Sequence, residues 1–165
     1  MDLYNFGNGD VPAHKHPNGG GWVADTAEVD ITCYVGPYAF VYDNARIKDN
    51  VRIDDYARVF GNASVCQNAK VYGDAQVYGQ AVLYNNSKVS VKAKVYGKAQ
   101  VYGHAKVYGD CQIFDLAQVY GNAKVSGNAK VYENARVVDN AMVHDNAEIY
   151  GNAIIRNNAE IFNYA

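Results

Sequence analysis

The stretch AKVYGKAQVYGHAKVYGD, residues 93–110, repeats one six-residue unit three times. Each unit begins with Ala, carries Val at its third position, and continues with Tyr-Gly. Side chains that alternate between inward and outward positions over Ala-Lys-Val-Tyr are typical of a β-strand, and Val and Tyr favour strands. The Gly, Asn and Asp residues that follow such units tolerate the left-handed backbone of a tight turn. Each unit therefore predicts a short strand followed by a corner.

The same unit extends over almost the whole chain. It runs from Gly21 to Tyr164 without an insertion or deletion, which is 144 residues or 24 units. The third position is always aliphatic, and the first is nearly always Ala. A strand this short is not stable alone, so the units must stack and bury these residues in one narrow core. We expect the 165 residues to form one domain.

This pattern resembles the hexapeptide-repeat superfamily with its acyltransferase-like repeats, and in particular the uninterrupted A-K-V-Y-G-N-type proteins of bacteria and phages. The resemblance implies an all-β fold, a single left-handed parallel β-helix shaped as a triangular prism, with 18 residues per coil and about eight coils. The left hand rests on the resemblance alone, because parallel crossovers are otherwise right-handed. Residues 1–20 lie outside the frame and are expected to cap residues 21–165, and Phe162 and Tyr164 are expected to blunt the last coil.

Residues 18 apart would stack in such a coil, so one outer face carries a column of aromatic residues. Stacked aromatic side chains stabilise neighbouring strands, and this is one interpretation of the column. The other is a strip that binds a partner protein or a second copy of the chain, with glycan stacking as a further alternative. Together with two aromatic residues of the adjacent column, the predicted surface is Trp22, Phe40, Tyr42, Phe60, Tyr78, Tyr96, Phe114, Tyr132 and Tyr150.

A second face carries a basic column, formed by Arg52, Lys70, Lys88, Lys106 and Lys124. The side chains are either solvated, or bind an acidic protein, or form an anion site with Tyr72 and Tyr108 beside it. Aromatic residues among basic ones suit single-stranded nucleic acid, but the formal net charge of -2 does not favour nucleic acid as a partner. A neighbouring corner column of Asn residues, interrupted by His104, predicts a ladder of side-chain amides.

Catalysis has two candidate residues, His104 and His144, because the resemblance is to acyltransferases and histidine can act as a general base near neutral pH. Neither has an apparent orienting partner in the sequence, so no catalytic residue is predicted. The four histidines do not have the spacing of a three-histidine site, and we predict no metal and no cofactor.

The favoured function is a non-enzymatic solenoid scaffold that binds a macromolecular partner, most simply a protein, through its flat faces. A phage-encoded protein that engages a host factor would be one such scaffold. The alternatives are an acyl-CoA-dependent acyltransferase and a glycan- or nucleic-acid-binding β-helix. A homo-oligomer is expected. The sequence shows no signal peptide and no membrane segment, which predicts the cytoplasm of a bacterial or phage-infected cell.

Overall fold

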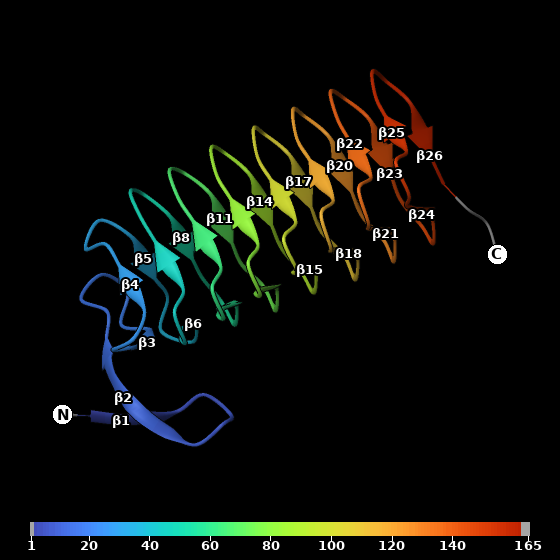
Figure 1. Ribbon diagram of the computed structural model, residues 1–165. Coiled ribbons are helices and arrows are strands. Elements are labelled where there is room, and N and C mark those ends of the chain that lie inside the picture. Colours follow the sequence, from blue (N-terminus) through green and yellow to red (C-terminus); the bar gives the residue numbers. More distant parts are fainter. Residues whose placement is uncertain (1, 163–165) are drawn as a thin grey trace.

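The computed structural model describes residues 2–162, which form an elongated parallel β-solenoid (Figure 1). The chain passes through one strand of each of three sheets per coil, and strands 18 residues apart pair in parallel. Lys88, for example, lies between Lys70 and Lys106 in the same sheet. This confirms the predicted all-β solenoid with 18-residue coils and about eight turns.

Three sheets run along the long axis, and each is named here by a letter. Sheet A contains β1 (Asp2–Asn5), β2 (Asp10–Lys15), β3 (Trp22–Ala24), β6 (Phe40–Val41), β9 (Arg58–Val59), β12 (Gln76–Val77), β15 (Lys94–Val95), β18 (Gln112–Ile113), β21 (Lys130–Val131) and β24 (Glu148–Ile149). Sheet B contains β4 (Glu28–Val29), β7 (Arg46–Ile47), β10 (Ser64–Val65), β13 (Val82–Leu83), β16 (Gln100–Val101), β19 (Gln118–Val119), β22 (Arg136–Val137) and β25 (Ile154–Ile155). Sheet C contains β5 (Tyr34–Val35), β8 (Arg52–Ile53), β11 (Lys70–Val71), β14 (Lys88–Val89), β17 (Lys106–Val107), β20 (Lys124–Val125), β23 (Met142–Val143) and β26 (Glu160–Ile161).

The core is a narrow column of small and aliphatic side chains. The first and third residues of each unit point inward, and Val95, Val101 and Val107, one from each sheet, are fully buried. Ser87 is the polar exception at a first position, and its hydroxyl has no hydrogen-bond partner among residues 2–162. Because the interior is filled, any ligand must bind on the outer faces or corners.

The corners use the left-handed backbone that the sequence predicts. Gly97 has φ 67°, and a Cβ there would lie 2.8 Å from the backbone nitrogen of Asp115. Other corners carry acidic residues, whose carboxylates accept hydrogen bonds from the backbone of the next coil. Asp43 accepts from the N–H of Gly61 at 3.1 Å. Many acidic side chains therefore hold corners together rather than neutralise basic residues on the sheets.

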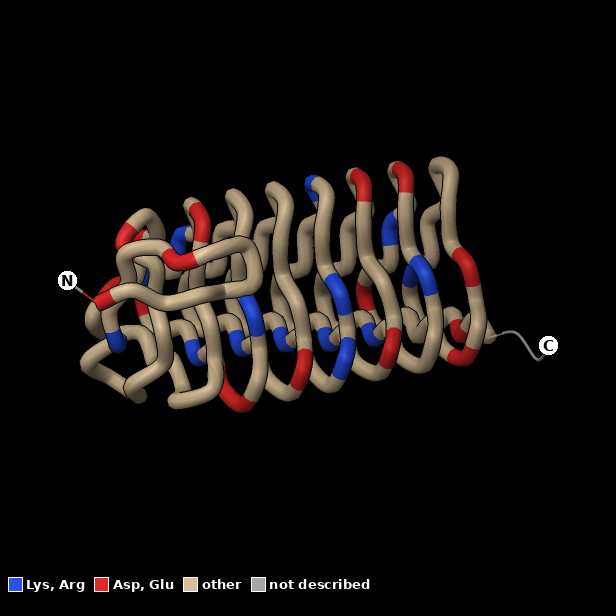
Figure 2. Tube along the Cα trace, turned by 90° about the horizontal axis from the view of Figure 1, so that it is seen from below, with Lys and Arg blue, Asp and Glu red and all other residues tan. Residues whose placement is uncertain are grey.

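Residues 2–15 form an antiparallel hairpin, and its second strand, β2, pairs antiparallel with β3. The hairpin continues sheet A beyond β3 and bends across the first coils (Figures 1 and 2). The Tyr4 ring stacks on Trp22 at 4.6 Å between ring centroids, and the Phe6 ring stacks on Tyr42 at 4.9 Å. At the other end, Phe162 is about half exposed, and Tyr164 lies outside the described residues. No helix able to span a bilayer occurs between residues 2 and 162.

Candidate functional site

Four consecutive strands of sheet C begin with lysine, and we call Lys70, Lys88, Lys106 and Lys124 the lysine column. Three in-register pairs link the four lysines of successive coils, and Lys124, the last of them, pairs with Met142 of the following coil. No acidic residue lies within three residues of any of these lysines in the sequence, and the units of Lys70 and Lys106 end at the corners in Asp74 and Asp110. Adjacent strands lie about 4.8 Å apart, and like charges directly opposite one another are destabilising. The middle of sheet C is therefore a strip of uncompensated positive charge.

No acidic side chain of residues 2–162 forms an ion pair with any member of the lysine column. The fifth residue of the predicted basic column differs. Arg52 contacts the carboxylate of Asp54, and its guanidinium lies 4.0 Å from the centre of the Tyr34 ring. The predicted column of five thus divides into one compensated arginine and four uncompensated lysines.

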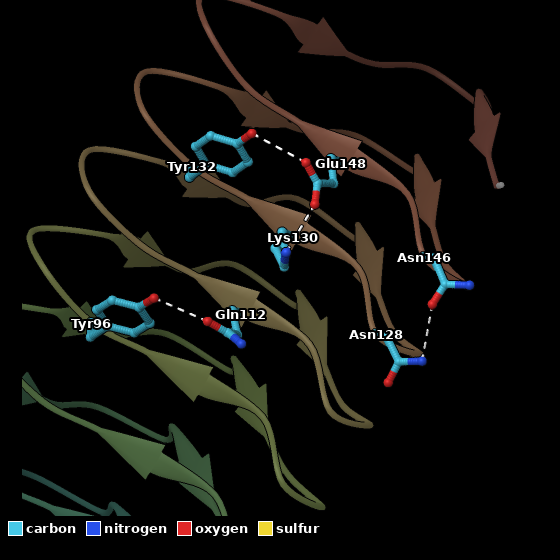
Figure 3. Close-up of polar contacts among 7 residues, drawn as sticks. All are labelled: Tyr96, Gln112, Asn128, Lys130, Tyr132, Asn146 and Glu148. Carbon is cyan, nitrogen blue, oxygen red and sulfur yellow. Dashed lines mark hydrogen bonds and ion pairs between the residues drawn. The ribbon is translucent and has the colours of Figure 1, made fainter. Parts of the chain in front are cut away.

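Sheet A shows how the same fold places a lysine whose charge is balanced. Lys130 is paired in register with Glu148, and its ammonium lies 2.9 Å from that carboxylate (Figure 3). This contact raises the pKa of Lys130 and lowers the pKa of Glu148. Basic residues recur at equivalent places of successive coils (Figure 2). In the middle of sheet C, however, the in-register neighbour of a lysine is another lysine and not a carboxylate, as it is for Lys130.

A groove of about 750 Å³ runs along one side of the lysine column. Its other wall is the predicted corner column, and it contains His104 together with Asn50, Asn68, Asn86 and Asn122. The amide ladder occurs only beyond His104, where Asn122 donates to Asn140 and Asn140 donates to Asn158, each at 3.2 Å. No ladder bond joins the earlier amides within the described part of the chain. Those amides, and the exposed His104, are available to a ligand in the groove.

Two smaller hollows lie on the other side of the lysine column. One, of about 310 Å³, is lined by Arg52, Asp54, Asp55, Lys70, Tyr72 and Lys88. The second, of about 330 Å³, is lined by Tyr72, Lys88, Ser90, Val91, Lys106 and Tyr108. The lysine column is thus a ridge between amide groups and tyrosine rings. Tyr72, Ser90 and Tyr108 fall in one column at the 18-residue spacing of the sequence, whereas the position of Val91 beside them is not evident from that spacing.

The predicted aromatic surface on sheet A is a continuous stack of rings. From Tyr42 to Tyr132, consecutive rings lie 4.8–5.0 Å apart between centroids and within 2–6° of parallel. Each ring face is therefore covered by the ring of the neighbouring coil. At the start of the stack the hairpin covers Trp22, Phe40 and Tyr42, and Tyr42 is only 8% exposed.

Polar contacts also hold this stack to its own sheet. The hydroxyl of Tyr96 donates to Gln112 at 3.0 Å, and the hydroxyl of Tyr132 lies 3.3 Å from the Glu148 carboxylate (Figure 3). Burial raises the pKa of Tyr96 above its ordinary value, which favours the protonated hydroxyl that donates this hydrogen bond. The geometry favours the stabilising interpretation of the aromatic column, and binding at its uncovered part, from Phe60 to Tyr150, stays a prediction.

Neither histidine candidate has the geometry of an oriented general base. Both ring nitrogens of His144 face carboxylates, Nε2 at 2.9 Å from Glu160 and Nδ1 at 3.3 Å from Asp145. The hydrogen bond to Glu160 is the main cause of a raised pKa for His144, so the contact favours the protonated form of the imidazole. His104 makes no side-chain hydrogen bond within residues 2–162. Among these residues no group of three or more His, Cys, Asp or Glu side chains could hold a metal ion.

Comparison with protein families gives one match. A family model described as the YdcK beta solenoid repeat matches residues 117–133, a segment that contains β19, β20 and β21. It agrees with the solenoid and covers one turn of it. Comparisons with curated proteins and with solved structures give no match.

Proposed function

We propose that the protein is a non-enzymatic solenoid scaffold that binds an extended anionic macromolecule along sheet C. The observation that carries this proposal is the lysine column, which has four lysines in consecutive coils and no acidic partner among the described residues. Neighbouring lysines repel one another, and a bound anion would remove that repulsion.

The shape of the column favours a polymer over a compact anion. The four strands that carry the lysines span three spacings of about 4.8 Å, so one phosphate or carboxylate cannot contact all four ammonium groups. A chain that follows the solenoid axis can contact each of them in turn. The groove on the Asn side adds neutral donors and acceptors beside the charges.

Two features of the molecule direct this proposal away from the other candidate surfaces. The ring faces of the aromatic column on sheet A are already covered by neighbouring rings and by the hairpin. The geometry of His104 and His144 gives no support to acyl transfer, because one lacks an orienting acid within the described chain and the other has both nitrogens engaged.

The proposal predicts polyanion binding that depends on the lysine column. The probes are polyglutamate and a fluorescent single-stranded oligonucleotide, and fluorescence anisotropy, with unlabelled polyglutamate as competitor, measures the affinity over a range of salt concentrations. Lys88→Gln with Lys106→Gln should weaken binding roughly tenfold or more, and for the oligonucleotide the slope of log K against log salt should fall by about 1.4.

The matched control is Lys94→Gln with Lys98→Gln, which removes the same charge from exposed positions on sheet A and its corner. It should leave binding nearly unchanged. If the wild-type protein binds neither probe at low salt, or if both double variants lose affinity equally, the proposal fails.

A further inference from the structure

The residue that follows each strand of the solenoid stacks on its equivalents in the neighbouring coils. In sheet B these residues include Tyr84, Tyr102 and Tyr120, whose rings lie 4.6 Å apart between centroids and within 6° of parallel. Tyr102 is thus held between two rings, one above it and one below. The space between the rings of Tyr84 and Tyr120, which are two coils apart, thus holds one planar aromatic ring.

Sheet C repeats this arrangement with the middle ring missing. The residues that follow β11, β14 and β17 are Tyr72, Ser90 and Tyr108. Their backbones are equivalent: the N–H of Tyr72 donates to the carbonyl of Val89, and the N–H of Ser90 donates to the carbonyl of Val107. Ser90 is buried, whereas Tyr72 and Tyr108 are each 38% exposed. The space over Ser90 is the hollow of about 330 Å³, and we call it the Ser90 slot.

The Ser90 slot combines aromatic, cationic and apolar groups. Lys88 and Lys106, the central residues of the lysine column, line it together with the two tyrosines. Val91 lies at its corner with φ 63°, a left-handed conformation that costs free energy for a β-branched residue. The equivalent residues of the adjacent coils are Gly73 and Gly109. Val91 therefore adds an exposed apolar side chain at the slot, at a position where the fold favours glycine.

We propose that the Ser90 slot binds a planar aromatic base between Tyr72 and Tyr108, while Lys88 and Lys106 bind the phosphate next to that base. The ligand is then a nucleotide unit of a single-stranded nucleic acid. The inference rests on the proposed function, because it names the polymer that follows the lysine column.

The chemistry of a single strand fits both parts of the site. Every nucleobase has two π-faces, and stacking on aromatic side chains contributes to binding without requiring a particular base. A base in the slot takes the place that Tyr102 has in sheet B, between two rings. Lys70 and Lys124 extend the basic strip beyond the slot on both sides, so neighbouring phosphates of the same strand also meet lysines. A duplex keeps its bases paired and stacked inside, where the slot cannot reach them.

The test compares probes with and without bases. A fluorescent single-stranded oligonucleotide of about ten nucleotides and an abasic strand with the same phosphates are titrated with the wild-type protein and with Ser90→Tyr, which fills the slot with a third ring. The wild-type protein should prefer the strand that carries bases by roughly tenfold. Ser90→Tyr should remove that preference and leave binding of the abasic strand unchanged.

A second variant keeps the proposal testable if Ser90→Tyr does not fold. Val91→Gly installs the residue that the neighbouring coils already have, so its melting temperature should not fall, while its preference for bases should decrease. Free nucleotide is distinguished by titrating AMP. If AMP binds as tightly as the oligonucleotide, the ligand is a mononucleotide and the single-strand assignment is overturned.

The possible failures are separable. If both strands bind equally and neither variant changes this, the slot proposal is wrong while the polyanion scaffold stands. The same conclusion follows if polyglutamate binds as tightly as the oligonucleotide and Ser90→Tyr changes neither affinity. The partner is then an acidic protein segment. If no polyanion binds at low salt, both proposals fail together.

Discussion

His144 is a residue whose protonation is coupled to the fold by two neighbouring carboxylates. Its imidazole lies between the carboxylates of Asp145 and Glu160, and the hydrogen bond to Glu160 raises its pKa above the ordinary value. A histidine whose pKa is raised by folding stabilises the folded state fully below its unfolded pKa of about 6.5. That contribution is lost as the pH rises through the folded pKa.

NMR titration of the histidine ring protons tests this directly. His144 should titrate above its ordinary pKa of about 6.5, and Glu160→Gln should shift the titration toward lower pH because it removes the main cause of the raised pKa. Asp145→Asn should have the smaller effect. A titration that Glu160→Gln leaves unmoved would show that the contact does not persist in solution.

At the scale of the strand stacks, ring contacts are expected to stabilise the solenoid. Tyr96 has ring neighbours on both sides, Tyr78 at 4.9 Å and Phe114 at 5.0 Å, whereas Tyr120 has one, Tyr102 at 4.6 Å. Tyr96→Ser should lower the free energy of unfolding by about 1–2 kcal/mol, and Tyr120→Ser by about half as much. Urea denaturation followed by circular dichroism measures both.

The same variants separate a stabilising stack from an interface. A role limited to stability predicts that Tyr96→Ser leaves the light-scattering mass of the protein unchanged. A drop from an oligomer to a monomer would instead support the alternative that sheet A binds a second copy of the chain. Equal destabilisation by the two substitutions would contradict the ring-neighbour explanation.

The columns on the faces could be predicted from the sequence, because parallel strands in register place residues 18 apart side by side. Lys88 and Lys106 were assigned to one column in this way, and Tyr78 and Tyr96 to another. The absence of acidic partners was not readable, because Asp74 and Asp110 end two of the lysine-bearing units, and only the structure shows that neither forms an ion pair with the lysine column. The Ser90 slot was not readable either, because it depends on ring size and on the distance between rings two coils apart.

The hairpin shows where a sequence pattern is insufficient. Its strands lie outside the six-residue frame, and its packing depends on long-range contacts of Tyr4 and Phe6 with sheet A. The glycines at its turn, Gly7 and Gly9, both have positive φ and are a hairpin signal that was available. The contact surface on Trp22 and Tyr42 could not be inferred, because no local pattern aligns residues 4–6 with the coils.

At the scale of the whole molecule, the hairpin covers the first coils of a structure held by contacts between adjacent repeats. Trp22 is the only tryptophan of the chain, and it lies 4.6 Å from the Tyr4 ring between centroids. Tyr4→Ser should therefore increase the quenching of tryptophan fluorescence by acrylamide, because it exposes one face of that ring. Tyr4→Phe keeps the ring and is the matched control.

Loss of this cover should also loosen the solenoid from one end. In repeat proteins each coil is stabilised mainly by its neighbours, so disruption starts at a terminal coil and extends inward. Hydrogen exchange in Tyr4→Ser should speed up in β3 to β5 and stay slow in the central coils. Uniformly faster exchange along the chain would indicate a single cooperative unit, contrary to this expectation.

The 18-residue register constrains how the gene can change in length. Gain or loss of 18 residues adds or removes one complete coil, and every downstream side chain keeps its sheet. Loss of only six residues between β14 and β17 would preserve the buried pattern, yet Lys106 and Lys124 would move from sheet C to the positions of sheet B. Such a deletion would fold and still cut the basic strip in two, so selection on the strip would permit size variation only in whole turns.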